Sequence, residues 1–318
     1  MSKKVLLLTF SGTGNTAICG EMIKNHLTSL KYEVTHFIYK KDKEFNLNPA
    51  DFDIIGIGYP IHAFNVPAPF NKFLKTLPNV DNKKLFIYKV SGEPFHLNDA
   101  SSYHFVKKLK KKGYNLMIEK HFLMPYNIMF DYPEALKKQM YLYLDKLTYL
   151  LALQLDNNET ELIKYKLRYK VLSFFLRIEW IAGAVNSVFV HIKKDKCVRC
   201  DKCIKECPTN SVYLNKKGTI KIHPSTCCLC TKCVHDCPKD AITFGFMNLW
   251  KVNGKFMYQK LVNDKSINGN FVNDDTKGYF HLFNKYFTLK KEELKARNIS
   301  LPDLDDNSTE KAEIKQTI

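Results

Sequence analysis

The first half of the chain contains short apolar runs, each followed by glycine, proline or polar residues. Five of these runs, residues 3–10, 32–39, 52–59, 84–90 and 114–124, are predicted as strands. Residues 133–155 are predicted as an amphipathic helix that ends at 156–158. Strands that alternate with helical segments indicate a parallel sheet covered by helices on both faces. The pattern therefore predicts an α/β doubly wound parallel sheet for residues 1–158.

A loop of glycines and hydroxyl residues directly follows the first predicted strand. It reads Ser11, Gly12, Thr13, Gly14, Asn15 and Thr16. Such a loop lets backbone N–H groups converge on a phosphate, and the N-terminus of the following helix adds positive potential. The loop lacks the Gly-Lys-Ser/Thr ending of a Walker A motif, which excludes that class of site. It resembles the phosphate loop of flavodoxins, and this resemblance implies FMN as the cofactor.

Two further loops are expected to complete the flavin site. Ligands of open α/β sheets bind beyond the carboxyl ends of the strands, and these loops follow the third and fourth predicted strands. Their residues are Pro60, Ile61, His62, Ala63 and Phe64 after the third strand, and Ser91 and Gly92 after the fourth. In flavodoxins the first loop holds the isoalloxazine ring, so Phe64 or His62 is expected to stack there. The alternative for His62 is an ordinary solvent-facing histidine, and Phe95 is the nearest candidate for a second aromatic.

Eight of the ten cysteines form two runs with the same spacing. They read Cys197-x2-Cys200-x2-Cys203-x3-Cys207-Pro208 and Cys227-x2-Cys230-x2-Cys233-x3-Cys237-Pro238. This is the bacterial run for [4Fe-4S] ligation, in which the fourth cysteine of one run binds the cluster of the other. The spacing predicts cluster I on Cys197, Cys200, Cys203 and Cys237, and cluster II on Cys227, Cys230, Cys233 and Cys207.

Zinc and disulfides are the alternative uses of these cysteines. A zinc site needs one closed set of four ligands and would leave the third cysteine and the Cys-Pro of each run unexplained. Disulfides require an oxidising compartment, whereas the apolar run at Val5–Leu8 is too short for a signal peptide or a membrane span. We therefore expect a cytoplasmic location. Cys228 fits neither run and is interpreted as a packed residue, with a redox-sensing thiol as the alternative.

The remaining segments complete the predicted domain organisation. Residues 193–245 are expected to form a small α+β bacterial ferredoxin domain, with a hairpin at 212–222 and a closing strand at 241–244. Residues 159–192 are interpreted as a helical connector. Arg177 and Glu179 lie within its apolar part, and a charge at mid-bilayer costs about 2.5–3.5 kcal/mol, which argues against a membrane span. An interfacial membrane helix remains the alternative.

The C-terminal extension, residues 246–318, divides into two parts. Its first part carries enough aromatic residues to pack onto another element; they are Trp250, Phe256, Tyr258, Phe280 and Phe283. After about residue 302 the composition becomes polar and charged, which predicts disorder.

The chain is basic, with a formal net charge of +17. The basic residues are spread along the chain and no nucleic-acid reader motif accompanies them, so nucleic-acid binding is not expected. In residues 193–245 there are 11 basic against 5 acidic residues. This excess suits an acidic redox partner, because complementary charge speeds encounter. The alternative is simply a lysine-rich surface.

The order of the two modules resembles the bacterial and archaeal flavodoxin-ferredoxin fusion proteins, sometimes called EFR-type ferredoxins. The resemblance covers residues 1 to about 245 and implies FMN, two [4Fe-4S] clusters and electron transfer. Redox chemistry leads to the same function, because a flavin exchanges two electrons in single steps and each cluster carries one. Two alternatives stay open: an iron–sulfur carrier whose first domain only docks a partner, and a flavin-dependent reductase of a small substrate.

Overall fold

The first half of the chain forms a five-stranded parallel sheet in the computed structural model, which describes residues 2–301, with the side chains of 178–180 outside this description. The strand order is β2-β1-β3-β4-β5, as in flavodoxin-like folds. The strands span Lys4–Thr9 (β1), Glu33–Ile38 (β2), Ile54–Pro60 (β3), Lys83–Ser91 (β4) and Tyr114–Leu123 (β5). Each strand overlaps its predicted run to within two residues at either end. The predicted doubly wound fold is therefore confirmed.

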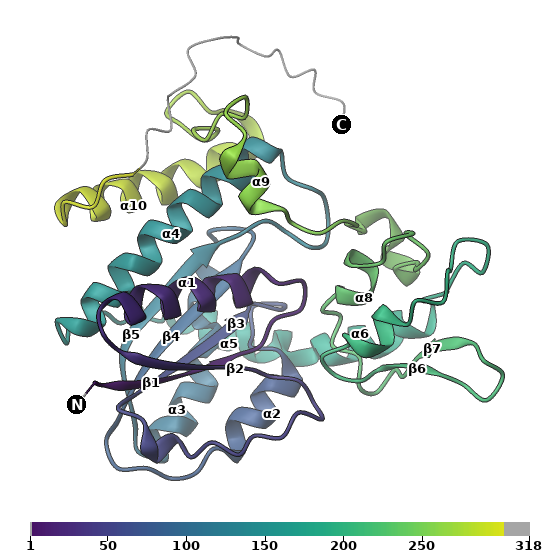
Figure 1. Cartoon of the computed structure of the whole chain (residues 1–318), viewed down its shortest axis with the longest axis horizontal. Helices are drawn as coiled ribbons and strands as arrows, with labels where there is room; N and C mark the ends of the chain where they lie inside the picture. Colours follow the sequence, from purple (N-terminus) through teal and green to yellow (C-terminus); the bar gives the residue numbers. More distant parts are fainter. Residues whose placement is uncertain (1, 302–318) are drawn as a thin grey trace.

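Helices cover both faces of the sheet (Figure 1). Helices α1 (Asn15–Ser29) and α4 (Glu134–Asp156) lie on one face, and α2 (Ala68–Thr76) and α3 (Tyr103–Lys111) lie on the other. Two short 3-10 helices, η1 (Pro49–Asp51) and η2 (His96–Ser102), occupy connections. The central strands are buried on both sides, because alternate residues of β1 join two different hydrophobic cores. Leu7 packs under α1 and α4, whereas Leu6 and Leu8 pack with residues of α2 and α3.

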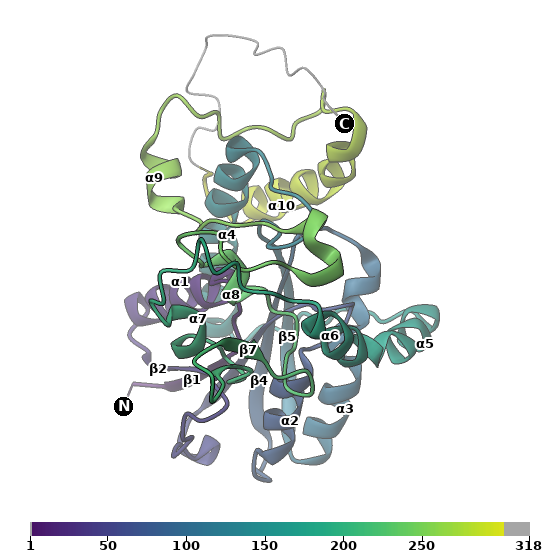
Figure 2. The same ribbon diagram turned by 90° about the vertical axis from the view of Figure 1, so that its right-hand side faces the viewer.

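The connector between the two halves consists of two helices rather than one continuous helix. They are α5 (Leu167–Phe175) and α6 (Glu179–Val188), separated by the 3-10 turn η3 (Leu176–Ile178). Figure 2 shows the two helices next to each other at one side of the molecule. None of the helices in the described part of the chain has both the length and the apolarity that a bilayer crossing requires.

The cysteine-rich segment forms a small unit of short elements beside the sheet (Figure 1). These are α7 (Lys202–Lys205), the antiparallel hairpin β6 (Val212–Leu214) and β7 (Ile220–Ile222), α8 (Lys232–His235) and η4 (Gly245–Trp250). The hairpin agrees with the prediction. The closing strand expected at 241–244 is wrong: only Ile242 is paired, in an isolated bridge with Ile192. At Gly245 the backbone takes a positive φ of 60° and starts a 3-10 helix, which ends the extended segment.

The C-terminal extension returns to the sheet domain and packs against α4. It contains α9 (Tyr258–Asn263), η5 (Gly278–Phe283) and α10 (Asn284–Ala296). Tyr258 and Phe283 are buried in the core beneath α4, as the aromatic content predicted. Trp250 does not follow this prediction, because half of its side chain is exposed. The predicted disorder after about residue 302 concerns residues outside the described part.

Candidate functional site

A cavity of about 420 Å³ opens beyond the carboxyl ends of β1, β3, β4 and β5. This volume lies within the usual range of small-molecule sites, about 300–1,000 Å³. All but one of the residues predicted to bind the flavin line it, namely Ser11, Gly12, Thr13, Asn15, Thr16, Pro60, Ile61, His62, Ala63, Phe64, Ser91 and Gly92. The other, Gly14, caps helix α1 with a φ of 112°, a conformation that glycine adopts readily. The fold thus brings the three predicted loops together around one space.

The phosphate end of the cavity is formed by the N-terminus of α1. The first N–H groups of a helix have no acceptor within the helix, so this end of α1 can bind an anion. The side chain of Asn15 is engaged elsewhere: its Nδ2 donates to the carbonyl of Pro125 at 2.9 Å, and its Oδ1 accepts from the hydroxyl of Tyr258 at 2.8 Å. Asn15 therefore holds the loop in place, and its backbone remains the group suited to a phosphate.

The ring end of the cavity is shaped by a tight turn after β3. The backbones of His62 and Asn65 pair with each other, and Ala63 and Phe64 between them have positive φ values of 41° and 60°. Asn65 fixes this turn to the connector, since its Nδ2 donates to the carbonyl of Ser173 at 3.0 Å. The turn places Phe64 in the cavity wall. The ring of His62 is half-buried and lies edge-on to Phe10, with the ring centroids 6.4 Å apart.

Glu93 and Tyr126, neither of them assigned to the site from the sequence, also line this end of the cavity. Glu93 is buried, and its carboxylate accepts hydrogen bonds from the hydroxyls of Tyr126 and Tyr279. Burial and this carboxylate raise the pKa of both tyrosines above its ordinary value. Tyr126 also packs over Gly92, where an added Cβ would lie 2.5 Å from the tyrosine ring. Tyr126 could have been assigned to the site from the sequence, because it follows the fifth predicted strand. No feature of the sequence around Tyr279 indicates that this residue lies near the site.

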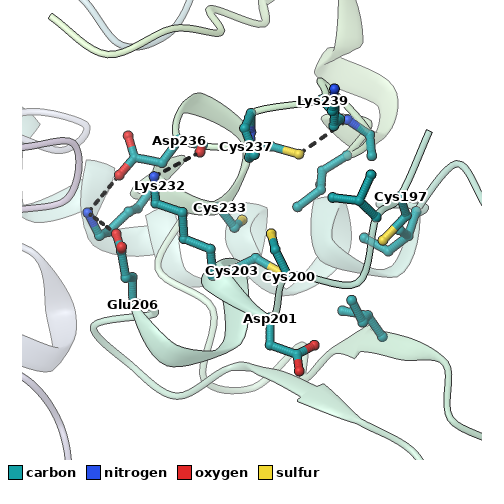
Figure 3. A pocket seen from close by; sticks show the side chains of 17 residues that line it. Cys197, Cys200, Asp201, Cys203, Glu206, Lys232, Cys233, Asp236, Cys237 and Lys239 are labelled. Atoms are coloured by element: carbon teal, nitrogen blue, oxygen red, sulfur yellow. Dashed lines mark hydrogen bonds and ion pairs between the residues drawn. The ribbon is translucent and has the colours of Figure 1, made fainter.

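A second cavity lies among the cysteines of the first run (Figure 3). Cys197, Cys200, Cys203 and Cys237 line it, together with Cys233 of the neighbouring set. Burial raises the pKa of Cys203 to about 11, and the nearby thiols of Cys200, Cys237 and Cys197 act in the same direction. The fourth cysteine of the second run is therefore close to the first three of the first run, the grouping predicted for cluster I.

The other four cysteines are grouped in the complementary way. Burial raises the pKa of Cys233, and the neighbouring thiols of Cys230, Cys227 and Cys207, together with Cys203 of the first set, act in the same direction. Backbone amides point at both crossing sulfurs, since Ser211 donates to Cys207 at 3.2 Å and Ala241 donates to Cys237 at 3.3 Å. The donor set, eight cysteine thiols, is of the kind that binds iron–sulfur clusters. Within the described residues, no three His, Cys, Asp or Glu side chains are arranged to hold a single metal ion.

An ion-pair network connects the two cysteine runs. The ammonium of Lys232, on α8, lies 3.1 Å from the carboxylate of Glu206 in the first run and 2.9 Å from that of Asp236 in the second (Figure 3). Burial opposes ionisation of Asp236, but hydrogen bonds from His235 and Lys232 outweigh it and lower the pKa of the carboxyl. Lys232 therefore fixes the position of α7 relative to α8.

The second cysteine run lies directly against the sheet-edge cavity. Leu229, between two cysteines of this run, forms part of the cavity wall. Gly12 of the phosphate loop approaches the run so closely that an added Cβ would be 2.8 Å from the carbonyl oxygen of Cys230. Asn127 connects the same parts, because its Nδ2 donates to that carbonyl at 3.2 Å and its own carbonyl accepts from Thr231 at 3.3 Å. The cavity and the cysteines predicted for cluster II therefore share one wall.

Cys228 is buried in the hydrophobic core that packs under α2 and α3, which agrees with its interpretation as a packed residue. It also contacts a predicted cluster ligand: a hydrogen bond from Cys228 lowers the pKa of Cys230 to about 7, against the opposing effect of burial. The sequence shows Cys228 directly after Cys227 and two residues before Cys230, but it does not show the direction of the Cys228 side chain.

One protein family and several solved structures match parts of this chain. The sequence profile of the 4Fe-4S dicluster domain family matches residues 191–241, which include all eight cysteines of the two runs. Solved structures similar to the first half of the chain include a flavodoxin from the domain Archaea, with 16% identity over 48% of this chain and 99% of that one and a TM-score of 0.35. Flavodoxin 2 from Bacillus cereus matches with 16% identity over 48% and 98% of the two chains and a TM-score of 0.35. No curated protein matches the chain.

The chain therefore combines a flavodoxin-like α/β domain with a ferredoxin-type 4Fe-4S domain. Iron–sulfur clusters carry single electrons, and open α/β sheets of this strand order bind their ligands at the loop edge that holds the first cavity. This combination indicates electron transfer.

Proposed function

We propose that this chain transfers electrons between an FMN in the sheet-edge cavity and two [4Fe-4S] clusters in the cysteine module. FMN supplies redox chemistry in which two electrons can be exchanged one at a time, matching the single-electron capacity of each cluster. The proposal includes the ligand sets predicted above, with Cys197, Cys200, Cys203 and Cys237 on cluster I and the remaining four on cluster II.

The observation that carries this proposal is the shared wall between the cavity and the second cysteine run. Leu229 lines the cavity, and it lies one residue before Cys230. Gly12 and Asn127 hold this part of the run against the phosphate loop and the loop after β5. An electron passing between the two modules therefore has a short covalent and hydrogen-bonded route through Leu229, Cys230 and Asn127. We accordingly propose cluster II as the first acceptor or last donor for the flavin.

Different residues of the cavity are proposed to bind different parts of the cofactor. The N–H groups of the α1 N-terminus and the hydroxyls of Ser11, Thr13 and Thr16 are proposed to bind the phosphate. Phe64 and Tyr126 offer aromatic surface at the opposite end of the cavity. Glu93 provides a buried carboxylate there, held in position by two tyrosine hydroxyls.

Anaerobic reconstitution tests the proposal. The full chain is loaded with iron, sulfide and FMN, and the bound iron and flavin are counted after gel filtration. Spectroelectrochemical titration then orders the potentials of the centres, and flash reduction of the flavin reports whether the clusters are reduced in the same molecule. The proposal is rejected if FMN does not bind, or if the reduced flavin leaves the clusters oxidised at low protein concentration.

Membership in the flavodoxin-ferredoxin fusion family, EFR type, is part of the proposal, as are a cytoplasmic location and a separate redox protein as the partner. The basic composition of residues 193–245 supports an acidic partner. If the partner is acidic, the rate of transfer to it should fall steeply with ionic strength, because salt screens complementary charges. A rate that does not change with salt would reject this choice of partner.

A flavin-dependent reductase acting on a small molecule is the second candidate. Glu93 favours it, since a buried carboxylate in the cavity wall that accepts hydrogen bonds from two tyrosine hydroxyls is a type of group used in proton transfer. Rapid substrate turnover by the FMN-loaded protein, retained after the clusters have been removed, would support this candidate over the first.

A further inference from the structure

The two connector helices expose large apolar side chains to solvent. On α5 the exposed side chains are Leu167, Val171, Leu172, Phe174 and Phe175. A soluble surface normally shows such residues singly, and a contiguous group of them marks an interaction site. Since α5 is only nine residues long, more than half of its side chains belong to this exposed apolar group.

Helix α6, the next α-helix along the chain, exposes a regular apolar stripe. Its inner side packs against the second cysteine run, where an added Cβ at Gly183 would lie 2.9 Å from the carbonyl oxygen of Cys227. The other side exposes Ile181, Val185, Val188 and, directly after the helix, Phe189. The spacing of three and four residues places these side chains on one face. The stripe therefore points away from the protein.

The 3-10 helix η4 extends the stripe beyond α6. Phe246 lies against Phe189, with the ring centroids 6.2 Å apart in an edge-on arrangement. Leu249, also within η4, is 95% exposed, and half of the Trp250 side chain is exposed as well. We refer to the exposed apolar side chains of α5, α6, residue 189 and η4 as the apolar face.

Basic residues accompany the apolar face. Residues 162–178 contain five basic and no acidic residues: Lys164, Lys166, Arg168, Lys170 and Arg177. The ammonium of Lys170 lies over the ring of Tyr103, 4.6 Å from its centroid. The guanidinium of Arg177 lies over the ring of Phe174, 5.5 Å from its centroid. Their charges are therefore held next to the apolar side chains.

We propose that the apolar face binds the surface of a membrane containing anionic lipids. Phenylalanine, leucine and tryptophan beside lysine and arginine is the composition of helices that lie in the headgroup region of a bilayer. The positive charge between residues 162 and 178 complements an anionic leaflet, and each basic group near such a surface contributes attraction that salt screens. Binding here would bring the membrane to the outer side of α6, whose inner side packs on the cysteines predicted for cluster II.

Vesicle co-sedimentation tests this inference without relying on the flavin. The cluster-loaded full chain is mixed with vesicles of phosphatidylcholine, or of phosphatidylcholine with about one third phosphatidylglycerol. We expect binding to the anionic vesicles that weakens with added salt. The double variant Phe175→Asp, Leu249→Asp should bind these vesicles at least about tenfold more weakly. It lacks two apolar side chains that would enter the membrane, and it adds two negative charges that the anionic lipids repel. Both side chains are exposed in the protein, so the variant is expected to fold.

Leu289→Asp is the matched control. Leu289 is 52% exposed, but it lies on α10, away from the connector helices, so this variant should bind the vesicles as the unchanged chain does. Equal loss of binding in the control and the double variant would overturn the proposal, as would no binding of the unchanged chain to anionic vesicles. A further outcome would also overturn it: the unchanged chain does not bind vesicles but dimerises as its concentration rises, and only the double variant stays monomeric. That result would show that a second copy of the chain covers the apolar face. None of these results depends on FMN, so they leave the proposed electron transfer to its own test.

Discussion

Substitution of Gly12 by alanine tests whether the cysteine module is held against the phosphate loop. The added Cβ would lie 2.8 Å from the carbonyl oxygen and 2.9 Å from the Cβ of Cys230. Real Cβ atoms essentially never approach other atoms this closely, and neither atom of Cys230 belongs to a flexible side-chain end that can turn away. Overpacking of this kind costs about 1–3 kcal/mol. Because the clash lies between two modules, the simplest relief is a small separation of the second cysteine run from the loop.

Hydrogen exchange at the junction measures this separation directly. Loss of about 1–3 kcal/mol from the local contact should raise amide exchange in residues 227–231 by about 5- to 150-fold. The experiment is done on FMN-free protein with its clusters loaded, so that altered flavin binding does not contribute. In the FMN-loaded protein, the same substitution should slow electron transfer between flavin and cluster, because the shared wall is disturbed.

Gly218→Ala provides the control for this experiment. Gly218 lies in the hairpin turn with a φ of 68°, and an added Cβ there meets no atom within 4 Å. The substitution strains the turn, but it should leave exchange at the junction unchanged. If Gly12→Ala leaves both exchange and transfer rate unchanged, the contact between the phosphate loop and Cys230 is refuted. If Gly218→Ala loosens the junction equally, the effect is general destabilisation rather than a local clash.

Four further predictions address the cofactor sites and the sheet domain. Cys200→Ser and Cys207→Ser should each lower the iron content by about half and abolish different electron paramagnetic resonance signals, since the two residues are assigned to different clusters; loss of the same signal would reject the crossed ligand sets. Tyr258→Phe removes the hydrogen bond to the phosphate loop and should weaken FMN binding about 2- to 10-fold in calorimetry, whereas an unchanged affinity would contradict this role. Glu119→Gln leaves the buried ammonium of Lys89, 2.8 Å away, without its ion-pair partner, and should cost about 3–5 kcal/mol in the free energy of unfolding; a loss below about 1 kcal/mol would count against it. Burial lowers the pKa of His121 to about 3, below the ordinary value near 6.5, so the unfolded chain binds one more proton than the folded protein between these two pH values. The free energy of unfolding should therefore fall as the pH falls through this window, by up to about 1.4 kcal/mol per pH unit. His121→Gln should remove this part of the pH dependence, and identical stability–pH profiles for the two proteins would disprove the prediction.

The elements of the sheet domain were predictable because their signals are local. Each buried strand is an apolar run, and the loop from Ser11 to Thr16 carries its own glycine and hydroxyl pattern. Ligands of open α/β sheets bind beyond the carboxyl ends of the strands, and this rule predicts that the loops after β3 and β4 lie at the same edge. Both loops line the cavity there. Applied once more, to the loop after β5, the same rule would have added Tyr126. The closing strand expected at 241–244 failed because a short apolar run does not show whether a partner strand is available beside it.

The connector shows where local patterns are ambiguous. An apolar run such as 171–192 suits a buried helix, a membrane helix or an exposed surface equally well, because periodicity alone does not reveal what covers each face. The structure divides the run at η3 and leaves much of its apolar surface exposed. Exposure is a property of the packed molecule, so it could not be read from the residues.

The sequence by itself indicated an iron–sulfur site and a phosphate-binding loop, because the spacing of the cysteines and the composition of the loop fix chemistry over a few residues. Only the tertiary structure decided how the sites are connected. The hydroxyl of Tyr258 reaches Asn15 across 243 residues of sequence, and that of Tyr279 reaches Glu93 across 186. The contact of Gly12 with Cys230 likewise joins distant parts of the chain. Such contacts form only when separate elements have packed, since no local pattern specifies which distant residue will occupy the remaining space.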